Sequence, residues 1–170
     1  VYSKDHDEFG SQFHDHLVEN LKYIIDNTNA KIVISSSWRS GGLERMKDMW
    51  TKRNYPGEVI GVTPDLSYQD DNDKYHKVKR GEEIDWYLKK NPSIKNYVIL
   101  DDDTDFLPHQ LGNFVQCSTN INHPDCVDIG YGLTKICSER AIRILNRKKK
   151  KKERIYKYYI SYCTNDKKCF

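Results

Sequence analysis

Apolar residues recur along the chain with two different spacings. Leu17, Leu21, Ile24 and Ile25 recur at helical spacing, which predicts an amphipathic helix over residues 13–27. Short apolar runs rich in β-branched residues alternate with such helical patterns and predict strands. The predicted strands are residues 31–35, 58–63, 97–100 and 113–117, and the further predicted helices are residues 43–50, 80–90 and 133–145. Strands that alternate with helices favour an α/β fold whose mostly parallel sheet is covered on both faces.

The composition of the chain changes sharply near residue 147. Residues 147–154 hold five consecutive lysines, two arginines and one glutamate, and four tyrosines follow within residues 155–162. A lysine run is typical of a solvated segment, while interleaved tyrosines leave contact with nucleic acid open as an alternative. We therefore divide the chain into a globular region, residues 1–146, and a basic, Tyr-rich C-terminal tail, residues 147–170. Within the globular region, the polar residues 65–76 predict a surface loop.

Bulk properties exclude several classes of protein. The net charge is only +3, with 28 basic and 25 acidic residues, so the chain as a whole is not an obvious polyanion binder. A mean hydropathy of −0.84 and the lack of a long apolar run exclude a transmembrane helix and a membrane partner. Residues 1–16 lack the pattern of a signal peptide, and the five cysteines show no Cys-x-x-Cys spacing. These features predict a reducing, cytoplasmic location, and they do not indicate an oligomeric state.

Four carboxylates follow the apolar run of residues 97–100 within five positions: Asp101, Asp102, Asp103 and Asp105. Like charges that close repel one another, and Mg²⁺ removes the repulsion because it prefers carboxylate oxygens as ligands. In open α/β sheets the ligand site lies at the carboxyl ends of the strands, where these acids fall. A Mg²⁺ site is therefore the favoured interpretation, and a solvated acidic turn is the alternative.

Hydroxyl and basic side chains follow or precede other predicted elements. Ser35 and Ser36 come at the carboxyl end of the strand over residues 31–35, where hydroxyls and backbone N–H groups suit a phosphate oxygen. Lys77, Lys79 and Arg80 stand directly before the third predicted helix, where a cation would offset phosphate charge. Taken alone, the serines are also typical of a turn or a helix cap. The basic residues alone are also typical of a solvated surface cluster.

The order of these groups resembles the haloacid dehalogenase (HAD) superfamily. The runs AKIVISSSWR, VTP, RGEEIDWYL, YVILDDDTDF and GLT are similar to the small HAD domain of Swiss-army-knife RNA-repair proteins, over about residues 13–146. The resemblance implies a three-layer Rossmann-like fold. Between Arg39 and Arg80 the chain has room only for a helix, a strand and a loop, so we expect little or no cap.

The resemblance also implies roles for individual residues. Ser35 matches the phosphate-binding hydroxyl of the family, followed by Ser36 as a second donor. Arg39 belongs to the subfamily signature and either braces the site or contacts substrate. The implied catalytic residues are Ser35, Arg80, Asp101 and Asp102; the implied substrate-binding residues are Ser35, Ser36, Arg39, Lys79 and Arg80; the implied Mg²⁺ ligands are Asp101, Asp102 and Asp105.

One element of the family pattern is not found. The family uses an Asp-x-Asp after a central apolar strand, and its first Asp attacks phosphorus. In this chain only Asp5-His6-Asp7 matches that sequence pattern, and the residues before it are too few and too polar for a buried strand. We consider three explanations in order of preference. The first is that an upstream segment carries this strand, and the second is that the domain is non-catalytic. The third is that Asp5 and Asp7 themselves act as the Asp-x-Asp pair.

The expected function follows from these roles. The resemblance implies a Mg²⁺-dependent phosphatase that hydrolyses a phosphomonoester through an aspartyl-phosphate, on nucleic-acid ends or nucleotides. The alternative is a catalytically inactive HAD-like module that binds a phosphorylated ligand or nucleic acid, the latter through the basic tail.

Overall fold

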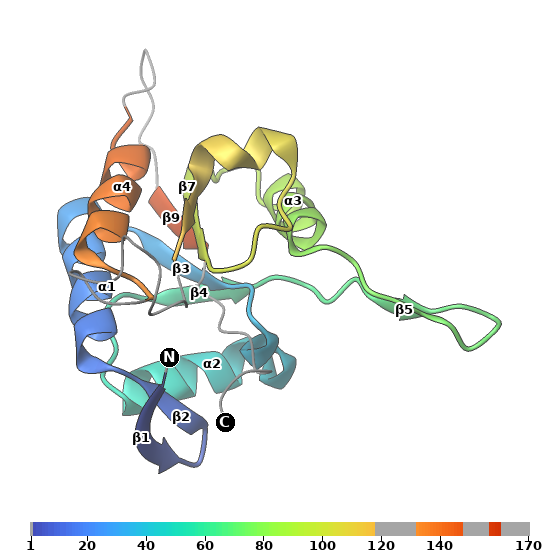
Figure 1. Ribbon diagram of the computed structural model, residues 1–170, viewed down its shortest axis with the longest axis horizontal. Helices are drawn as coiled ribbons and strands as arrows, with labels where there is room; N and C mark the ends of the chain where they lie inside the picture. The colour runs from blue at the N-terminus through green and yellow to red at the C-terminus, as the bar shows by residue number, and fades with distance from the viewer. Residues whose placement is uncertain (1, 118–131, 148–156, 161–170) are drawn as a thin grey trace, which may run out of the picture.

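A five-stranded parallel sheet forms the centre of the molecule in the computed structural model, which describes residues 2–117, 132–147 and 157–160, with side chains for residues 6–117 and 132–147. The order of its strands is β4-β3-β9-β7-β8, and every neighbouring pair is parallel (Figure 1). The strands are β3 (Lys31–Ile34), β4 (Val59–Val62), β7 (Asn96–Asp101), β8 (Phe114–Gln116) and β9 (Lys157–Ile160). The helices are α1 (Asp15–Thr28), α2 (Gly42–Lys52), α3 (Arg80–Lys90) and α4 (Lys135–Leu145), with two 3₁₀ helices, η1 (Ser37–Gly41) and η2 (Pro108–Asn113).

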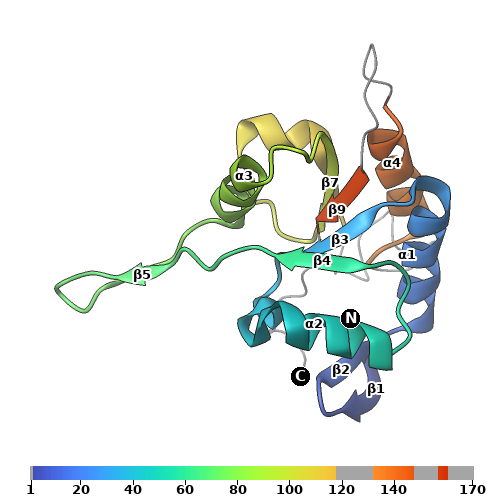
Figure 2. The same cartoon turned by 180° about the vertical axis from the view of Figure 1, so that it is seen from behind.

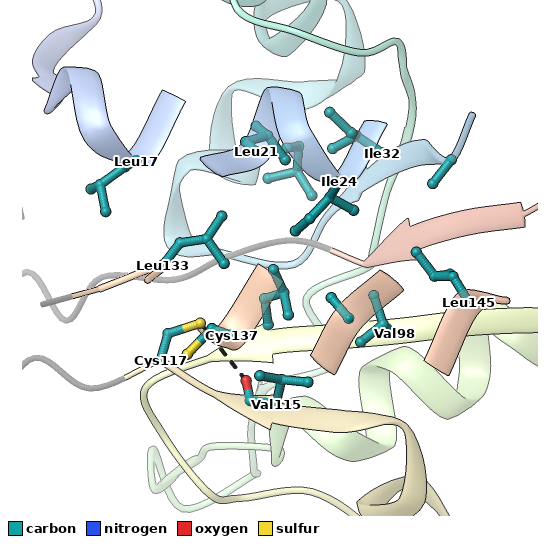
Figure 3. Close-up of a cluster of buried hydrophobic side chains, with 14 of the residues drawn as sticks. Leu17, Leu21, Ile24, Ile32, Val98, Val115, Cys117, Leu133, Cys137 and Leu145 are labelled. Carbon is teal, nitrogen blue, oxygen red and sulfur yellow. Dashed lines mark hydrogen bonds between the residues drawn. The ribbon is translucent and has the colours of Figure 1, made fainter. Parts of the chain in front are cut away.

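The helices pack on both faces of the sheet because strand side chains alternate. On β3, Ile32 and Ile34 join a large apolar cluster with α1, α2 and α4, part of which Figure 3 shows, whereas Val33 faces the other way. Val33 packs with Ile84 of α3 and with Ile99 of β7. The predicted α/β class is therefore confirmed, and each predicted strand and helix of the described globular region is present within a few residues of its expected bounds.

The middle position of the sheet is held by β9, which lies in the segment that the sequence analysis treats as a tail. Ile160 of β9 is in register with Val33 of β3 on one side and with Ile99 of β7 on the other. The rest of residues 148–170, and the irregular segment expected at residues 120–131, lie outside the described residues. Because one strand separates β3 from β7, their carboxyl ends lie at the same edge, about 10 Å apart at the usual strand spacing.

Two hairpins lie outside the main sheet (Figure 2). The first pairs β1 (Tyr2–Asp7) with β2 (Gly10–Phe13), so Asp5-His6-Asp7 lies in this hairpin and not at the sheet centre. Asp7 accepts hydrogen bonds from Arg53 Nε at 2.9 Å and Nη2 at 2.6 Å. The third explanation for the missing Asp-x-Asp thus places the pair in a hairpin outside the main sheet, with Asp7 in an ion pair with Arg53, and it stays untested.

The second hairpin projects from the body of the molecule and pairs β5 (Tyr68–Gln69) with β6 (Tyr75–His76) (Figures 1 and 2). The segment expected as a surface loop, residues 65–76, does lie at the surface, but Tyr68–Gln69 and Tyr75–His76 pair within it as short strands that the prediction did not include. Two-residue strands carry too short a pattern to be recognised from alternation. The tip is held by Asp70, which accepts the N–H groups of Asn72 and Lys74 at 2.9 and 3.0 Å.

No helix in the described ranges is both long enough and apolar enough to cross a membrane.

Candidate functional site

Three neighbouring strand ends place buried polar side chains at one edge of the sheet. Thr63 follows β4, Ser35 follows β3, and Asp101 ends β7; each has 2% or less of its surface exposed. The N–H of Thr63 donates to the carbonyl of Ile34 at 2.9 Å, which continues the β3–β4 pairing to the edge. Buried polar groups are costly unless they are satisfied, so their concentration here marks a site that apolar packing does not explain.

Asp101 is the most buried carboxylate of this edge. Its Oδ2 accepts a hydrogen bond from Arg80 Nη1 at 3.0 Å, and its Oδ1 accepts the N–H of Asp103 at 3.0 Å. Burial raises the pKa of Asp101 to about 7, although the positive charge of Arg80 acts against that rise. Burial likewise raises the pKa of Asp102 above its ordinary value. Two adjacent carboxyl groups with raised pKa values are typical of a functional site.

The acidic turn is fixed against the start of α3. Asp105 Oδ2 accepts the N–H of Arg80 at 3.1 Å, and its carbonyl accepts the N–H of Gly81 at 3.2 Å. The contact at Gly81 leaves no room for a side chain, because a Cβ there would lie 2.8 Å from the backbone of Leu107 and Phe106. The Gln110 amide bonds the carbonyl of Gly81 at 2.8 Å, so the turn and the helix form one rigid unit.

Arg39 connects the serine turn to the same helix. Its Nη1 donates to the carbonyl of Ser35, and its Nη2 donates to Glu83 Oε2 at 2.7 Å. Burial raises the pKa of Glu83, and the charge of Arg39 opposes the rise. Because Glu83 also accepts the N–H of Leu66 at 3.2 Å, this buried pair braces the turn after β3. The position of Arg39 matches the bracing role, one of the two that the sequence analysis left open.

The carboxylates of the acidic turn suit a divalent cation. Asp102 Oδ1 and Asp105 Oδ1 are buried, and neither has a hydrogen-bond partner among the described residues. A buried, unsatisfied carboxylate oxygen is costly unless a cation occupies the space beside it. Among the described residues, no three or more His, Cys, Asp and Glu side chains are grouped so that they could hold a metal ion together, so Asp101, Asp102 and Asp105 do not form the three-carboxylate site expected from the sequence. Mg²⁺ does not need such a group, because one or two carboxylates with water and a substrate phosphate satisfy it.

The structure brings together most, but not all, of the residues singled out from the sequence. Ser35, Arg39, Arg80, Asp101, Asp102 and Asp105 lie in one connected set of elements, with Ser36 capping η1. Lys79 precedes α3 and, like Lys77, is exposed without a described contact to the acidic turn. Sequence reasoning missed Thr63, Glu83 and Gln110; the only available signal was a polar residue at a position where the helical or strand pattern expects an apolar one.

A cavity of about 450 Å³ lies beside the serine turn. It begins at Ser37 and Trp38, directly after Ser36, and Phe9 and Arg45 line it as well. The guanidinium of Arg45 lies 5.1 Å from the centre of the Phe9 ring. Aromatic faces and a cation next to hydroxyl groups suit a planar ligand group that carries an anion.

Comparison with known proteins agrees with this geometry. No curated protein and no solved structure matches the chain. The model of the HAD domain in Swiss Army Knife RNA repair proteins matches residues 1–122, which include the serine turn, α3 and the acidic turn. The match covers more than half of the chain and includes the hydroxyl of Ser35 after β3, Arg80 at the start of α3 and the acids at the end of β7. The chain therefore belongs to the family of HAD domains found in Swiss Army Knife RNA repair proteins.

Proposed function

We propose that this HAD domain is the phosphate- and Mg²⁺-binding part of a phosphomonoester hydrolase, built as a three-layer Rossmann-like fold. The observation that carries the proposal is the buried Asp101, paired with Arg80 at the same sheet edge as Ser35. A buried anion–cation pair next to hydroxyl groups and unsatisfied carboxylate oxygens has the chemistry needed to hold a cation and a phosphoryl group together.

Each residue has a defined task in this proposal. Ser35 and Ser36 bind phosphoryl oxygens through hydroxyl or N–H groups, and Arg80 offsets negative charge beside them. Asp102 and Asp105 offer their unsatisfied oxygens to Mg²⁺, whose other ligands are water and substrate phosphate, while Asp101 stays paired with Arg80. Bound Mg²⁺ supplies neutralisation of phosphoryl charge. Arg39 and Glu83 keep the serine turn in place, so they position the site without contacting substrate.

The covalent step of the proposed reaction requires a carboxylate at the carboxyl end of the middle strand. The strand that holds the middle position is β9, whose four residues, Lys-Tyr-Tyr-Ile, include no carboxylate. This observation favours a second candidate function for the chain in this arrangement, namely a module that binds a phosphorylated ligand without hydrolysing it. The two candidates share the binding residues and differ only in turnover.

The substrate class we propose is a nucleotide or a nucleic-acid end. The cavity lined by Phe9, Trp38 and Arg45 supports this choice, because a nucleobase or ribose there would lie next to the phosphate-binding turn. The family description, which names RNA repair proteins, points the same way. Contact of the basic tail with nucleic acid and a cytoplasmic location stay predictions.

The binding claim is tested by calorimetric titration of the chain with inorganic phosphate, with and without Mg²⁺. We expect binding that depends on Mg²⁺, that weakens about tenfold or more in Ser35→Ala because a buried donor is lost, and that is unchanged in Ser93→Ala. Ser93 is exposed after α3 and serves as the matched control. Absence of phosphate binding in the presence of Mg²⁺ would contradict both candidate functions.

Turnover separates the two candidates. Hydrolysis of an aryl phosphate, measured with Mg²⁺ and with a chelator, identifies an enzyme if the rate depends on Mg²⁺ and falls in Asp102→Asn. Because β9 brings no carboxylate to the site, we expect little or no turnover while phosphate binding persists. Mg²⁺-dependent turnover by this chain would instead show that a nucleophile reaches the site from residues outside the described ranges.

The substrate class has its own test. Arg45→Gln should weaken binding of a nucleoside monophosphate several-fold and leave inorganic phosphate binding unchanged, because only the cavity loses a cation. Lys47→Gln, two residues further along α2 and outside the cavity lining, is the matched control. Equal effects of the two substitutions would argue against a nucleotide in the cavity.

A further inference from the structure

Two cysteines that take no part in the proposed phosphate site lie next to each other in the core. Cys117 directly follows β8 and is fully buried, and Cys137 lies in the first turn of α4 with 8% of its surface exposed. Figure 3 shows the two sulfur atoms side by side, close enough for the two side chains to interact, and its dashed line marks the hydrogen bond from Cys117 Sγ to the carbonyl of Val115 at 3.8 Å. Both are free thiols, so the structure holds a preformed dithiol.

The backbone holds both cysteines in this position. The N–H of Cys117 donates to the carbonyl of Asp101 at 2.7 Å, and the N–H of Cys137 donates to the N-cap hydroxyl of Thr134 at 3.2 Å. Cys137 Sγ also donates to the carbonyl of Gln116 at 3.5 Å, and α4 packs against β8. The backbone therefore holds the two thiols next to each other on elements that pack together, as formation of a disulfide requires.

We propose that Cys117 and Cys137 form a redox modification site, at which a hydroperoxide oxidises the dithiol to a disulfide. The Cys137 thiolate attacks the peroxide, so an S–O bond forms, the O–O bond breaks, and the leaving oxygen takes a proton and departs as water or an alcohol. The Cys117 sulfur then attacks the resulting sulfenic acid. The S–S bond forms, the S–O bond breaks, and hydroxide leaves as water with the Cys117 proton. The two thiols lose two electrons, which reduce the peroxide.

The two cysteines have different roles because their surroundings differ. The hydrogen bond from Cys117, and the Thr134 cap at the start of α4, lower the pKa of Cys137 to about 6. Cys117 is instead completely buried beside Cys137 and has no surface at which a peroxide could reach it. The thiolate is the attacking species, and Cys137 is also the more exposed of the two. Cys137 is therefore the residue that meets the peroxide, and Cys117 resolves the intermediate.

The disulfide would tie α4 to β8 beside the main chain of the acidic turn. Cys117 is bonded to Asp101 through the backbone, and the Gln116 side chain donates to the carbonyl of Asp102 at 3.0 Å. A crosslink between elements distant in sequence restricts the unfolded chain, so oxidation should raise the thermal midpoint by several degrees. This inference stands apart from the phosphatase proposal, since it needs neither Mg²⁺ nor phosphate.

The test is direct mapping of the bond in the full chain after treatment with hydrogen peroxide. Remaining thiols are alkylated under denaturing conditions, and trypsin with Asp-N separates Cys117 from Cys126 by cleavage before Asp125. We expect a linked pair of peptides carrying Cys117 and Cys137 that disappears on reduction with dithiothreitol. A Cys137 sulfinic acid with alkylated Cys117, or a bond from Cys137 to Cys126, Cys163 or Cys169, would overturn the proposal.

Two variants sharpen the result. Cys117→Ser should leave Cys137 as a sulfenic acid that dimedone traps, because the resolving thiol is gone, whereas Cys126→Ser should form the Cys117–Cys137 bond unchanged. Dimedone labelling of Cys137 that is no greater in Cys117→Ser than in the unsubstituted chain would contradict the assigned order of steps. Mapping on the unsubstituted chain decides the proposal if Cys117→Ser does not fold.

Discussion

Two acidic turns of this chain have almost the same composition and opposite environments. The turn after β7 carries Asp101, Asp102, Asp103 and Asp105, and the tip of the β5–β6 hairpin carries Asp70, Asp71 and Asp73. In the first, burial raises the pKa values of Asp101 and Asp102. In the second, hydrogen bonds from His76 and from two backbone N–H groups lower the pKa of Asp70.

The comparison shows that a run of aspartates in the sequence does not by itself indicate a cation site. At the hairpin tip, Asp70 is only partly buried and accepts hydrogen bonds from two backbone N–H groups and from His76, so its charge is satisfied without a cation. In the turn after β7, buried carboxylate oxygens lack partners among the described residues. The two acidic runs therefore differ in burial, and burial is the property on which we base the choice between the two interpretations.

Removal of the cationic partner should give the largest difference between the two turns. Arg80→Gln leaves the buried Asp101 without its ion pair and should lower the free energy of unfolding by about 3 kcal/mol near neutral pH. His76→Gln removes the partner of the exposed Asp70 and should change stability within measurement error. Denaturant unfolding of both variants provides the measurement. Equal losses would mean that burial does not distinguish the turns.

Close packing of the acidic turn against α3 should give the next largest effect. Gly81→Ala inserts a Cβ at 2.8 Å from backbone atoms and should cost about 2 kcal/mol of unfolding free energy. Gly112→Ala, at a position with open space around the new Cβ, is the matched control and should cost nothing measurable. Equal behaviour of the two alanines in denaturant unfolding would show that the turn gives way easily.

The two turns should also respond to pH with opposite signs. Asp101 has a folded pKa of about 7 against an ordinary value of 3.8, so between these values the folded state binds more protons. Its contribution to stability, measured in a chelator, is therefore full below about pH 4 and falls as pH rises through about 7. The lowered pKa of Asp70 gives a contribution that is present above its ordinary pKa and lost as pH falls toward the folded pKa.

Thermal midpoints across that range test the signs. Asp101→Asn should flatten the fall toward alkaline pH, whereas Asp70→Asn should leave it as it is in the unsubstituted chain. The prediction fails if the slope is the same in Asp101→Asn as in the unsubstituted chain, since other titrating groups would then account for it.

Much of the fold was predictable because its elements carry strong patterns. The apolar stripe of α1 and the runs before Ser35 and Asp101 give clear periods, and the helix predicted at residues 80–90 matches α3 in both bounds. The β5–β6 hairpin was missed because its strands have two residues each. The strand β9 was missed because Lys-Tyr-Tyr-Ile lies in a charged segment. Its position between β3 and β7 depends on pairing with both strands, which the local sequence does not indicate.

The site residues that directly follow a strand were predictable from the sequence. The residues that support the site through contacts between distant positions of the chain were not. Ser35 and Asp101 stand directly after apolar runs, so their common edge follows from a parallel sheet. Glu83 pairs with Arg39 across 44 positions of sequence, and no local pattern indicates such a contact. The Cys117–Cys137 pair was likewise hidden, because its spacing matches no established cysteine motif and the contact depends on how α4 packs against β8.

The central claim is that the turn after β7 binds a divalent cation and the hairpin tip does not. Its most direct test is the thermal midpoint with millimolar MgCl₂ against NaCl of equal ionic strength, for the unsubstituted chain, Asp102→Asn and Asp71→Asn. A cation that binds only the folded state raises the midpoint by mass action, by a few degrees if millimolar Mg²⁺ exceeds the dissociation constant. We predict this rise in the unsubstituted chain and in Asp71→Asn, and its loss in Asp102→Asn. No rise in the unsubstituted chain, or an equal rise in Asp102→Asn, would contradict the account.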